Sequence, residues 1–301
     1  MTERQDISGW EFAEPEVRAT GRARGLLRNA LRVRRTQVGL VITALVVGLA
    51  VVGPFLAPYS ETEFVGRPLA QNAPGTLFGT DYLGRDVFSR LLNGGVSVLI
   101  LAVLCTLLGV GVGLLVALVA GYGRGWVDEL LMRISDVLLA FPAIVLALLF
   151  LAIWGPEPWA IVLTVGAGHV PRVARVLRAA VLDVSSLDYV RSAEAMGLRR
   201  WSIRFGDLLP NVTGPLMVEA GLRLTYSVAL VAGLGFLGLS GLEADQADWG
   251  LMINENRTGL TVQPWAVLLP VLAIGLLTIG TNLVADGIAR AAAGIERRAD
   301  R

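Results

Sequence analysis

The sequence predicts an all-α, polytopic membrane protein. Of its 301 residues, 54% are hydrophobic and only 17% are charged, and the mean hydropathy is +0.63. A soluble domain carries nearer 25% charged residues. The apolar residues also fall into runs of about 20, which is the length at which an α-helix crosses about 30 Å of hydrocarbon. Together these observations exclude a soluble globular fold.

Six apolar segments are long enough to be transmembrane helices. The predicted spans cover residues 38–57, 96–120, 131–154, 158–178, 212–238 and 265–288. The third span contains Pro142 and the fifth contains Arg223, so neither of these two is uniformly apolar. With their connections they form one transmembrane domain over residues 38–298, which follows a basic segment over residues 1–37.

Arginine placement sets the orientation, because cytoplasmic loops carry an excess of positive charge. All 26 basic residues are arginine. With both ends inside, the cytoplasmic segments hold twenty-one arginines and the outside connections hold four. We therefore expect both termini, the basic segment 1–37 and the connection 185–211 to be cytoplasmic.

Two outside connections are long, residues 58–95 and 239–264. The first is rich in turn residues and then places Asp86 before "VFSRLL", where an aspartate can cap a helix. Val87, Leu91 and Leu92 share one face of that helix. The pattern predicts a short interfacial helix that leads into the second span.

Catalytic chemistry is nearly absent from the sequence. The lack of lysine excludes a P-loop lysine and a Schiff base, and a single histidine (His169) with a single cysteine (Cys105) leaves no Cys/His zinc site. The "GVGVG" run at 109–113 lacks a nucleotide-binding pattern; Gly109 and Gly113 instead form a GxxxG pair, which favours close helix packing. We expect no catalytic residue, no bound metal and no nucleic-acid partner.

Ionisable groups within the spans are functional candidates, because each costs about 2.5–3.5 kcal/mol at a helix centre. Asp136 and Asp286 lie near predicted cytoplasmic ends, where water or a partner relieves this cost. Glu219 and Arg223 are four residues apart, so they either pair with each other or contact substrate. His169 is more simply a hydrogen-bonded packing residue than a proton relay, since no carboxylate lies near it in the sequence.

The stretch "DYVRSAEAMGLRRWSIRFGDLLPN" at 188–211 has the pattern of a basic helix–turn–helix. Ser185 and Asp188 fit a capping box, Gly197 fits the C′ position that ends a helix, and Pro210 marks the return to the membrane. Two apolar faces follow the helical period: Tyr189, Ala193 and Met196, then Trp201, Phe205 and Leu208. Four arginines supply positive charge: Arg191, Arg199, Arg200 and Arg204. The segment either lies on anionic lipid headgroups or docks a soluble partner.

Three motifs give the chain a family resemblance. "YVRSAEAMGLRRWSIRFGDLLPN" resembles the EAA loop of binding-protein-dependent (MetI-like) ABC importer permeases, with Gly197, Leu209 and Pro210 on matching positions. "FGTDYLGRDVFSRLLNG" (78–94) is similar to an element of the C-type permease subunits of dipeptide and oligopeptide transporters. "GLGFLGLSG" (233–241) followed by "WGLMI" (249–253) is similar to another element of those subunits. The resemblance covers residues 38 to 298.

The charges of the EAA loop depart from the family pattern. Arg191 stands where glutamate is usual, Ser192 replaces the next alanine, Glu194 occupies a position that is commonly basic, and Asp207 stands where histidine is frequent. The charges are therefore swapped rather than lost. A matching ATPase would need a compensating pattern.

The resemblance implies one permease of an ATP-driven importer in the cytoplasmic (inner) membrane of a prokaryote. It implies as partners a second homologous permease, two cytoplasmic ATPase subunits, an extracytoplasmic solute-binding protein and membrane lipid. ATP and Mg would be bound by the ATPases, so this chain would hold no cofactor and would not be an enzyme. The residues expected to couple to the ATPase are Tyr189, Val190, Arg191, Ala193, Glu194, Ala195, Met196, Gly197, Leu198, Arg199, Trp201, Arg204 and Pro210.

The cargo that the resemblance implies is a dipeptide or oligopeptide. Nickel, glutathione or another small peptide-like ligand is the alternative within the same family. The competing class is a self-contained secondary transporter, which would leave the cytoplasmic docking loop unexplained. The residues that line the substrate path are not assigned.

Overall fold

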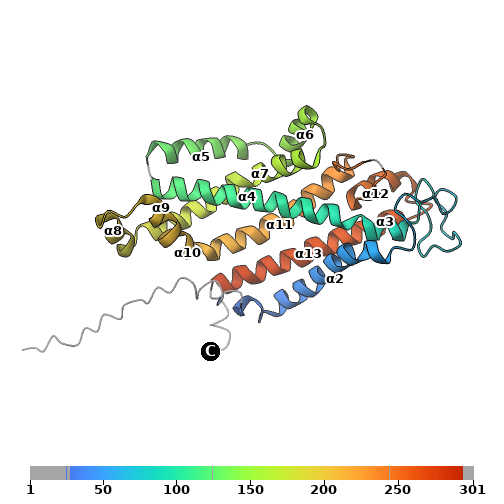
Figure 1. Ribbon diagram of the computed structural model, residues 1–301, viewed down its shortest axis with the longest axis horizontal. Helices are drawn as coiled ribbons and strands as arrows, with labels where there is room; N and C mark the ends of the chain where they lie inside the picture. The colour runs from blue at the N-terminus through green and yellow to red at the C-terminus, as the bar shows by residue number, and fades with distance from the viewer. Residues whose placement is uncertain (1–24, 26–27, 124, 244, 294–301) are drawn as a thin grey trace, which may run out of the picture.

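The computed structural model describes residues 25, 28–123, 125–243 and 245–293. Its regular structure is helical, and within these ranges the only β-contacts are two isolated bridges, Phe64–Arg85 and Thr80–Asp86. The long helices run side by side along the long axis of the molecule (Figure 1). This confirms the all-α prediction.

Five helices are long and apolar enough to cross a membrane, and a bent pair brings the number to as many as six. The five are α2 (Arg34–Leu56), α4 (Gly95–Gly123), α7 (Pro158–Ser185), α11 (Thr213–Phe236) and α13 (Trp265–Ala293). The bent pair is α5 (Trp126–Leu139) and α6 (Ala143–Trp154), which meet at 88°. Pro142 precedes α6 and lacks a backbone N–H, so the third predicted span is broken at the proline that made it non-uniform.

Short helices occupy the two ends of the bundle (Figure 1). One end carries α3 (Val87–Asn93), α12 (Trp249–Asn256) and the 3₁₀ turn η2 (Arg257–Gly259). The other end carries α8 (Asp188–Ala195), α9 (Arg200–Ser202), the π-helix η1 (Ile203–Leu208) and α10 (Leu209–Asn211). The start of α2 and the end of α13 lie together there, with Gly287 against Thr36. The connections assigned to opposite sides by the arginine count therefore lie at opposite ends, although most of segment 1–37 and the tail after 293 lie outside the described residues.

The predicted cap of the interfacial helix is confirmed. Asp86 precedes α3, and its carboxylate accepts hydrogen bonds from the Ser89 backbone N–H at 2.8 Å and hydroxyl at 2.6 Å. Val87, Leu91 and Leu92 are all buried. The helix thus packs one apolar face inward at the outer end of the bundle.

The GxxxG pair lies where α4 packs against α7. A Cβ atom at Gly109 would lie 2.5 Å from Cβ of His169, and one at Gly113 would lie 2.6 Å from Cβ of Val173. Distances this short do not occur between real side chains. The two glycines therefore permit the close approach of α4 and α7, as the sequence predicted.

Enlarging Gly113 is expected to destabilise this contact. In Gly113→Leu the new side chain overlaps Val173, and overpacking of this kind costs about 1–3 kcal/mol. Gly111→Leu is the matched control, since Gly111 is exposed and a Cβ atom added there would have no heavy atom within 4 Å. Thermal unfolding in detergent should show a lower midpoint for Gly113→Leu alone; equal midpoints would contradict the close α4–α7 packing.

Candidate functional site

The 185–211 segment joins α7 to α11 at the inner end of the bundle. The helix α8 begins at Asp188, and its N-cap residue Leu187 makes no side-chain capping hydrogen bond. Ser185 instead belongs to the last turn of α7, where its hydroxyl donates to the carbonyl of Leu182 at 2.9 Å. The predicted capping box is therefore wrong, because α7 runs seven residues beyond its predicted end at 178 and takes Ser185 with it.

Gly197 ends α8 as predicted. Its φ of +74° lies in the left-handed region that favours glycine. The Gly197 N–H donates to the Glu194 carbonyl at 2.9 Å, and the Leu198 N–H donates to the Ala193 carbonyl at 3.2 Å. This pair of bonds is a Schellman motif, so Gly197 fixes the angle at which the chain leaves α8.

The inward face of α8 differs from the predicted one. Val190 is completely buried and Ala193 is 5% exposed, and both pack against the ends of α4 and α7. Met196, predicted to share this face, is 73% exposed. The helix ends at Ala195, so Met196 lies past the last turn and points away from the bundle.

The second predicted face is wrong in a similar way. Ile203 and Leu208 are buried, whereas Trp201 is 57% and Phe205 is 44% exposed. The π-helix η1 widens the turn here, so residues spaced for an α-helix no longer share a face. The rings of Trp201 and Phe205 stack on each other with centroids 5.6 Å apart. Pro210 lies in the first turn of α10, where its missing N–H costs no hydrogen bond.

Two charged side chains tie the segment to α4. The Arg204 guanidinium lies 4.9 Å from the ring centroid of Trp201 and 5.5 Å from that of Tyr122. The side chain is only 8% exposed, and burial lowers the pKa of Arg204. Glu194 hydrogen-bonds to Tyr122. Arg204 is therefore a packing residue of this end rather than one of the free surface cations that the sequence predicted.

The remaining side chains form one exposed surface, which we call the inner face. Its exposed apolar members are Leu187, Met196, Leu198, Trp201 and Phe205. Its exposed arginines are Arg191, Arg199 and Arg200. The predicted coupling residues Tyr189 and Ala195 lie beside them, half-buried and exposed respectively. Leu187 and Phe205 were not among the predicted coupling residues, and their exposure on this surface comes from the structure alone.

Most of the ionisable side chains that the sequence placed within the spans have partners in the structure. Glu219 and Arg223 are both buried, with Oε2 and Nε 3.1 Å apart, which confirms that they can pair. His169 shares a hydrogen bond of 2.9 Å with the Ser227 hydroxyl, as expected for a packing histidine. Asp136 pairs with Arg175 of α7, a partner that the sequence did not reveal. Asp286 is exposed near the end of α13.

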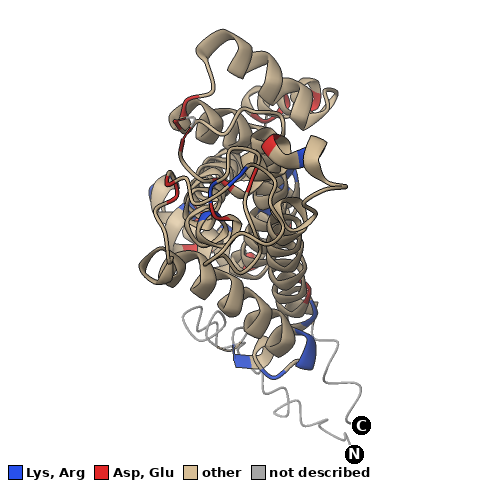
Figure 2. Cartoon of the chain, turned by 90° about the vertical axis from the view of Figure 1, so that its right-hand side faces the viewer, with Lys and Arg blue, Asp and Glu red and all other residues tan. Residues whose placement is uncertain are grey.

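A second cluster of charges, the outer cap, joins the 78–94 motif to α12, whose first five residues are the "WGLMI" stretch. Asp81 Oδ2 lies 2.7 Å from Arg85 Nε and 3.5 Å from Arg90 Nε. Glu255 Oε2 of α12 lies 3.3 Å from Arg85 Nη2 and 3.0 Å from Arg90 Nη2. Arg90 is completely buried, and its Nη1 also donates to the carbonyls of Glu61 and Asp245. Figure 2 looks onto this end, where basic and acidic segments meet near the centre.

The outer cap holds its charges away from water. Burial raises the pKa of Glu255, while the positive charges of Arg90 and Arg85 oppose that rise. The Tyr82 hydroxyl donates to Glu255 Oε1 at 3.2 Å, and the Tyr82 N–H donates to Asn256 at 2.9 Å. The first outside connection is therefore fastened to the second through ion pairs between residues far apart in the chain.

The chain matches proteins of one transport family. Residues 109–294, more than half of the chain, match the family described as binding-protein-dependent transport system inner membrane component. The glutathione transport system permease protein GsiD of Pectobacterium atrosepticum is 34% identical over 263 residues, 87% of each chain. The dipeptide transport system permease protein DppC of Alkalihalophilus pseudofirmus is 34% identical over 253 residues, 83% of each chain. GsiD of Escherichia coli is also 34% identical, over 262 residues.

These matches settle the class of protein that the fold alone leaves open. An all-helical bundle with five or six spans is compatible with many transporters, whereas the family match runs from the middle of α4 to the end of α13 and includes the 185–211 segment. A binding-protein-dependent system requires a binding protein and an ATPase besides its membrane component. The chain belongs to the family of binding-protein-dependent transport system inner membrane components, as a multi-pass bacterial inner-membrane permease that is not itself the ATPase.

Proposed function

We propose that this chain is one of two homologous permease subunits in an ABC importer for dipeptides or oligopeptides. Support comes from relatives named for dipeptide and glutathione transport, both 34% identical over most of the chain. Two cytoplasmic ATPases bind ATP and Mg and drive the cycle, and an extracytoplasmic binding protein delivers the substrate. The permease itself holds no cofactor in this scheme.

Glutathione is the second candidate cargo. The relatives named for it match as well as the one named for dipeptides, and glutathione is itself a peptide with free carboxylates. Purifying the intact complex and identifying by mass spectrometry what its binding protein carries separates the two. A dipeptide or oligopeptide supports the first proposal, glutathione supports the second, and a ligand of neither kind overturns both.

We propose the inner face as the docking surface for an ATPase. The observation that carries this proposal is the exposed, stacked pair Trp201 and Phe205 beside exposed arginines, on a segment whose other side is packed into the bundle. Exposed aromatic and arginine side chains are the residue types that dominate protein interfaces. Because the segment joins α7 to α11, closure of an ATPase pair would move these two helices together.

The docking proposal is tested by a crosslinking scan. Single cysteines at residues 189–204 in the assembled complex are expected to form adducts with the ATPase at the exposed positions, Arg191 and Met196 among them, and not at buried Val190. Glu194 stays a predicted contact as well, although it also hydrogen-bonds to Tyr122. A scan without ATPase adducts would contradict the docking surface.

Trp201→Ala is expected to weaken ATPase binding at least about tenfold. An aromatic anchor at an interface contributes about 2 kcal/mol or more, and about 1.4 kcal/mol corresponds to tenfold. Trp159→Ala is the matched control, because Trp159 is similarly exposed (54%) but begins α7 at the opposite end. Titrating purified ATPase onto the permease pair in nanodiscs measures both; equal affinities would exclude Trp201 as an anchor.

A further inference from the structure

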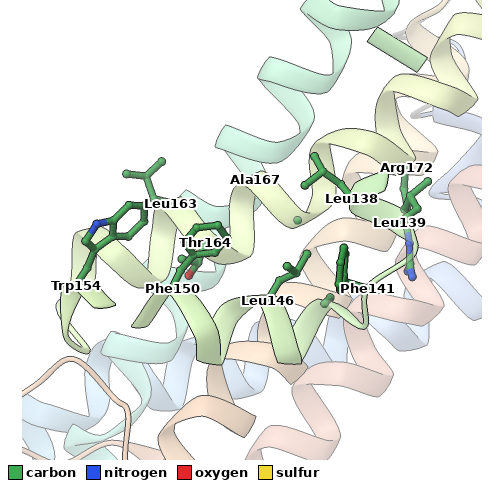
Figure 3. A pocket seen from close by; sticks show the side chains of 12 residues that line it. Leu138, Leu139, Phe141, Leu146, Phe150, Trp154, Leu163, Thr164, Ala167 and Arg172 are labelled. Atoms are coloured by element: carbon green, nitrogen blue, oxygen red, sulfur yellow. The ribbon is translucent and has the colours of Figure 1, made fainter. Parts of the chain in front are cut away.

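A cavity lies in the elbow between α5, α6 and α7. Its volume is about 180 Å³, and the 88° bend at Pro142 gives the elbow its shape. Figure 3 shows Phe150 and Trp154 toward one end, Leu146 along the floor, and Arg172 with Phe141 at the other end. The cavity is therefore apolar along its length and cationic at one end.

Arg172 differs from the other two arginines of its helix. Arg175 forms an ion pair with Asp136. Arg178 forms a bidentate ion pair with Asp128, in which its Nε and Nη2 each lie 2.5 Å from a carboxylate oxygen. Arg172 lines the cavity with an exposed side chain and has no ion pair or hydrogen bond within the part of the chain that the structure describes. The α7 helix thus carries three arginines at three-residue spacing. Two of them have a carboxylate partner among the described residues, and Arg172, beside the cavity, has none there.

Arg172 lies on the cytoplasmic half of the predicted span 158–178. It is fourteen residues after Pro158, or about 21 Å along α7, and its side chain is exposed on the described chain. A charge inside a membrane segment costs about 2.5–3.5 kcal/mol near the helix centre and marks a functional site by default. Thr164, the other polar side chain at the wall, already donates to the carbonyl of Ala160 at 2.8 Å. Arg172 is therefore the group that a ligand in this cavity would satisfy.

The opposite end of the cavity suits an apolar group. The rings of Phe150 and Trp154 stack with centroids 5.3 Å apart. A volume of about 180 Å³ is below the 300–1,000 Å³ of typical drug-sized sites. The cavity therefore fits one amino-acid residue better than a whole oligopeptide.

We propose that this cavity binds the C-terminal residue of a peptide substrate during its passage through the membrane. Arg172 binds the terminal carboxylate, for which a guanidinium offers two parallel N–H donors. Phe150 and Trp154 pack against the last side chain. The inference rests on the proposed peptide cargo and names residues that contact it.

The first test measures uptake by the complete transporter in vesicles. With the dipeptide Ala-Phe as cargo, Arg172→Gln is expected to lower the uptake rate at least tenfold, while ATP hydrolysis stimulated by the loaded binding protein stays within twofold. Arg172→Lys, which keeps the charge, should retain part of the uptake. Arg133→Gln is the matched control, because it removes an exposed arginine of α5 paired with Glu129. Unchanged uptake in Arg172→Gln overturns the proposal.

The second test looks for substrate in the cavity directly. Ala167 lines the cavity and is exposed, so Ala167→Cys should react with a thiol reagent, while the only native thiol, Cys105, is buried. Ala-Phe should slow this labelling at least fivefold, whereas its C-terminal amide should not, and adding Arg172→Gln should abolish the protection. Val176→Cys, exposed on α7 but outside this cavity, is the matched control.

The outcomes separate this inference from the proposed function. If the wild-type complex takes up neither dipeptide nor glutathione, the proposed cargo fails. If it takes up peptide but Ala-Phe gives no protection at Ala167→Cys, only the cavity proposal fails. A defect of Arg172→Gln that appears in vesicles containing phosphatidylglycerol and vanishes in pure phosphatidylcholine would assign Arg172 to lipid headgroups and overturn the substrate contact.

Discussion

Replacing Gly197 with valine is expected to reduce substrate uptake at least about tenfold and to abolish the stimulation of ATP hydrolysis by loaded binding protein. The φ of +74° at this position costs an L-residue about 1–2 kcal/mol, and more when the side chain is β-branched. The chain would escape this strain by changing its exit from α8 and so breaking the Schellman bonds to Glu194 and Ala193. The inner face would then be presented at a different angle.

The effect of Gly197→Val is one of backbone conformation rather than of a clash. No heavy atom lies within 4 Å of a Cβ built at Gly197. Gly197→Asn is therefore the informative control, because asparagine tolerates the left-handed region. We expect Asn to retain most of the coupling and both variants to insert into the membrane normally. Normal substrate-stimulated hydrolysis in reconstituted Gly197→Val would refute the role of this angle.

Arg90→Met is expected to destabilise the protein by about 3–5 kcal/mol, because removing one partner of a buried ion pair leaves the other charges uncompensated. Arg90 is completely buried and contacts both Asp81 and Glu255. In Arg133→Gln the lost pair with Glu129 is exposed, so the change should cost less than about 1 kcal/mol. Thermal unfolding of the two variants in the same detergent measures the difference.

The Arg90→Met defect should also depend on pH. Burial raises the pKa of Glu255 and the charge of Arg90 lowers it, so the variant raises this pKa further. A carboxyl whose folded pKa exceeds its unfolded value binds more protons in the folded state, and stability then falls as pH rises through the folded pKa. The loss relative to wild type should therefore be smaller at pH 5 than at pH 7. If the loss of stability in Arg90→Met is equal at pH 5 and pH 7, the loss does not arise from the charge on Glu255.

Local patterns in the sequence predicted the parts of the molecule that depend on local physics. The lengths of the apolar runs indicated the spans, and the glycines at 109 and 113 indicated the α4–α7 contact. Gly197 and Asp86 were correctly placed as the end and the start of helices, since each acts within four residues of its own position. The break at Pro142 was marked by the proline, but its 88° angle was not, because the angle depends on packing against α7.

The features that the sequence did not predict depend on contacts between residues far apart in the chain, which sequence spacing does not reveal. Glu255 meets Arg90 although the two are 165 positions apart, and Asp136 meets Arg175 on a different helix. The apolar faces of 188–208 were wrong for a different reason: an early helix end at Ala195 and a π-turn after Ile203 shifted which residues point inward. A helical period applied without these interruptions places Trp201 in the core, whereas it lies on the surface.

The outer cap holds together the ends of several helices on its side of the bundle. It joins the connections that lead into α4 and α13, and Gly241 of the second connection lies against Pro156 and Pro158 at the start of α7. The α7 helix then extends for 28 residues, about 42 Å, to the segment that bears the inner face. The α7 helix is therefore held by contacts at its first turn, while its other end leads directly to α8. If an ATPase moves α8, the displacement along α7 would grow with distance from this contact, so Arg175 and Arg178 would move farther than Trp159.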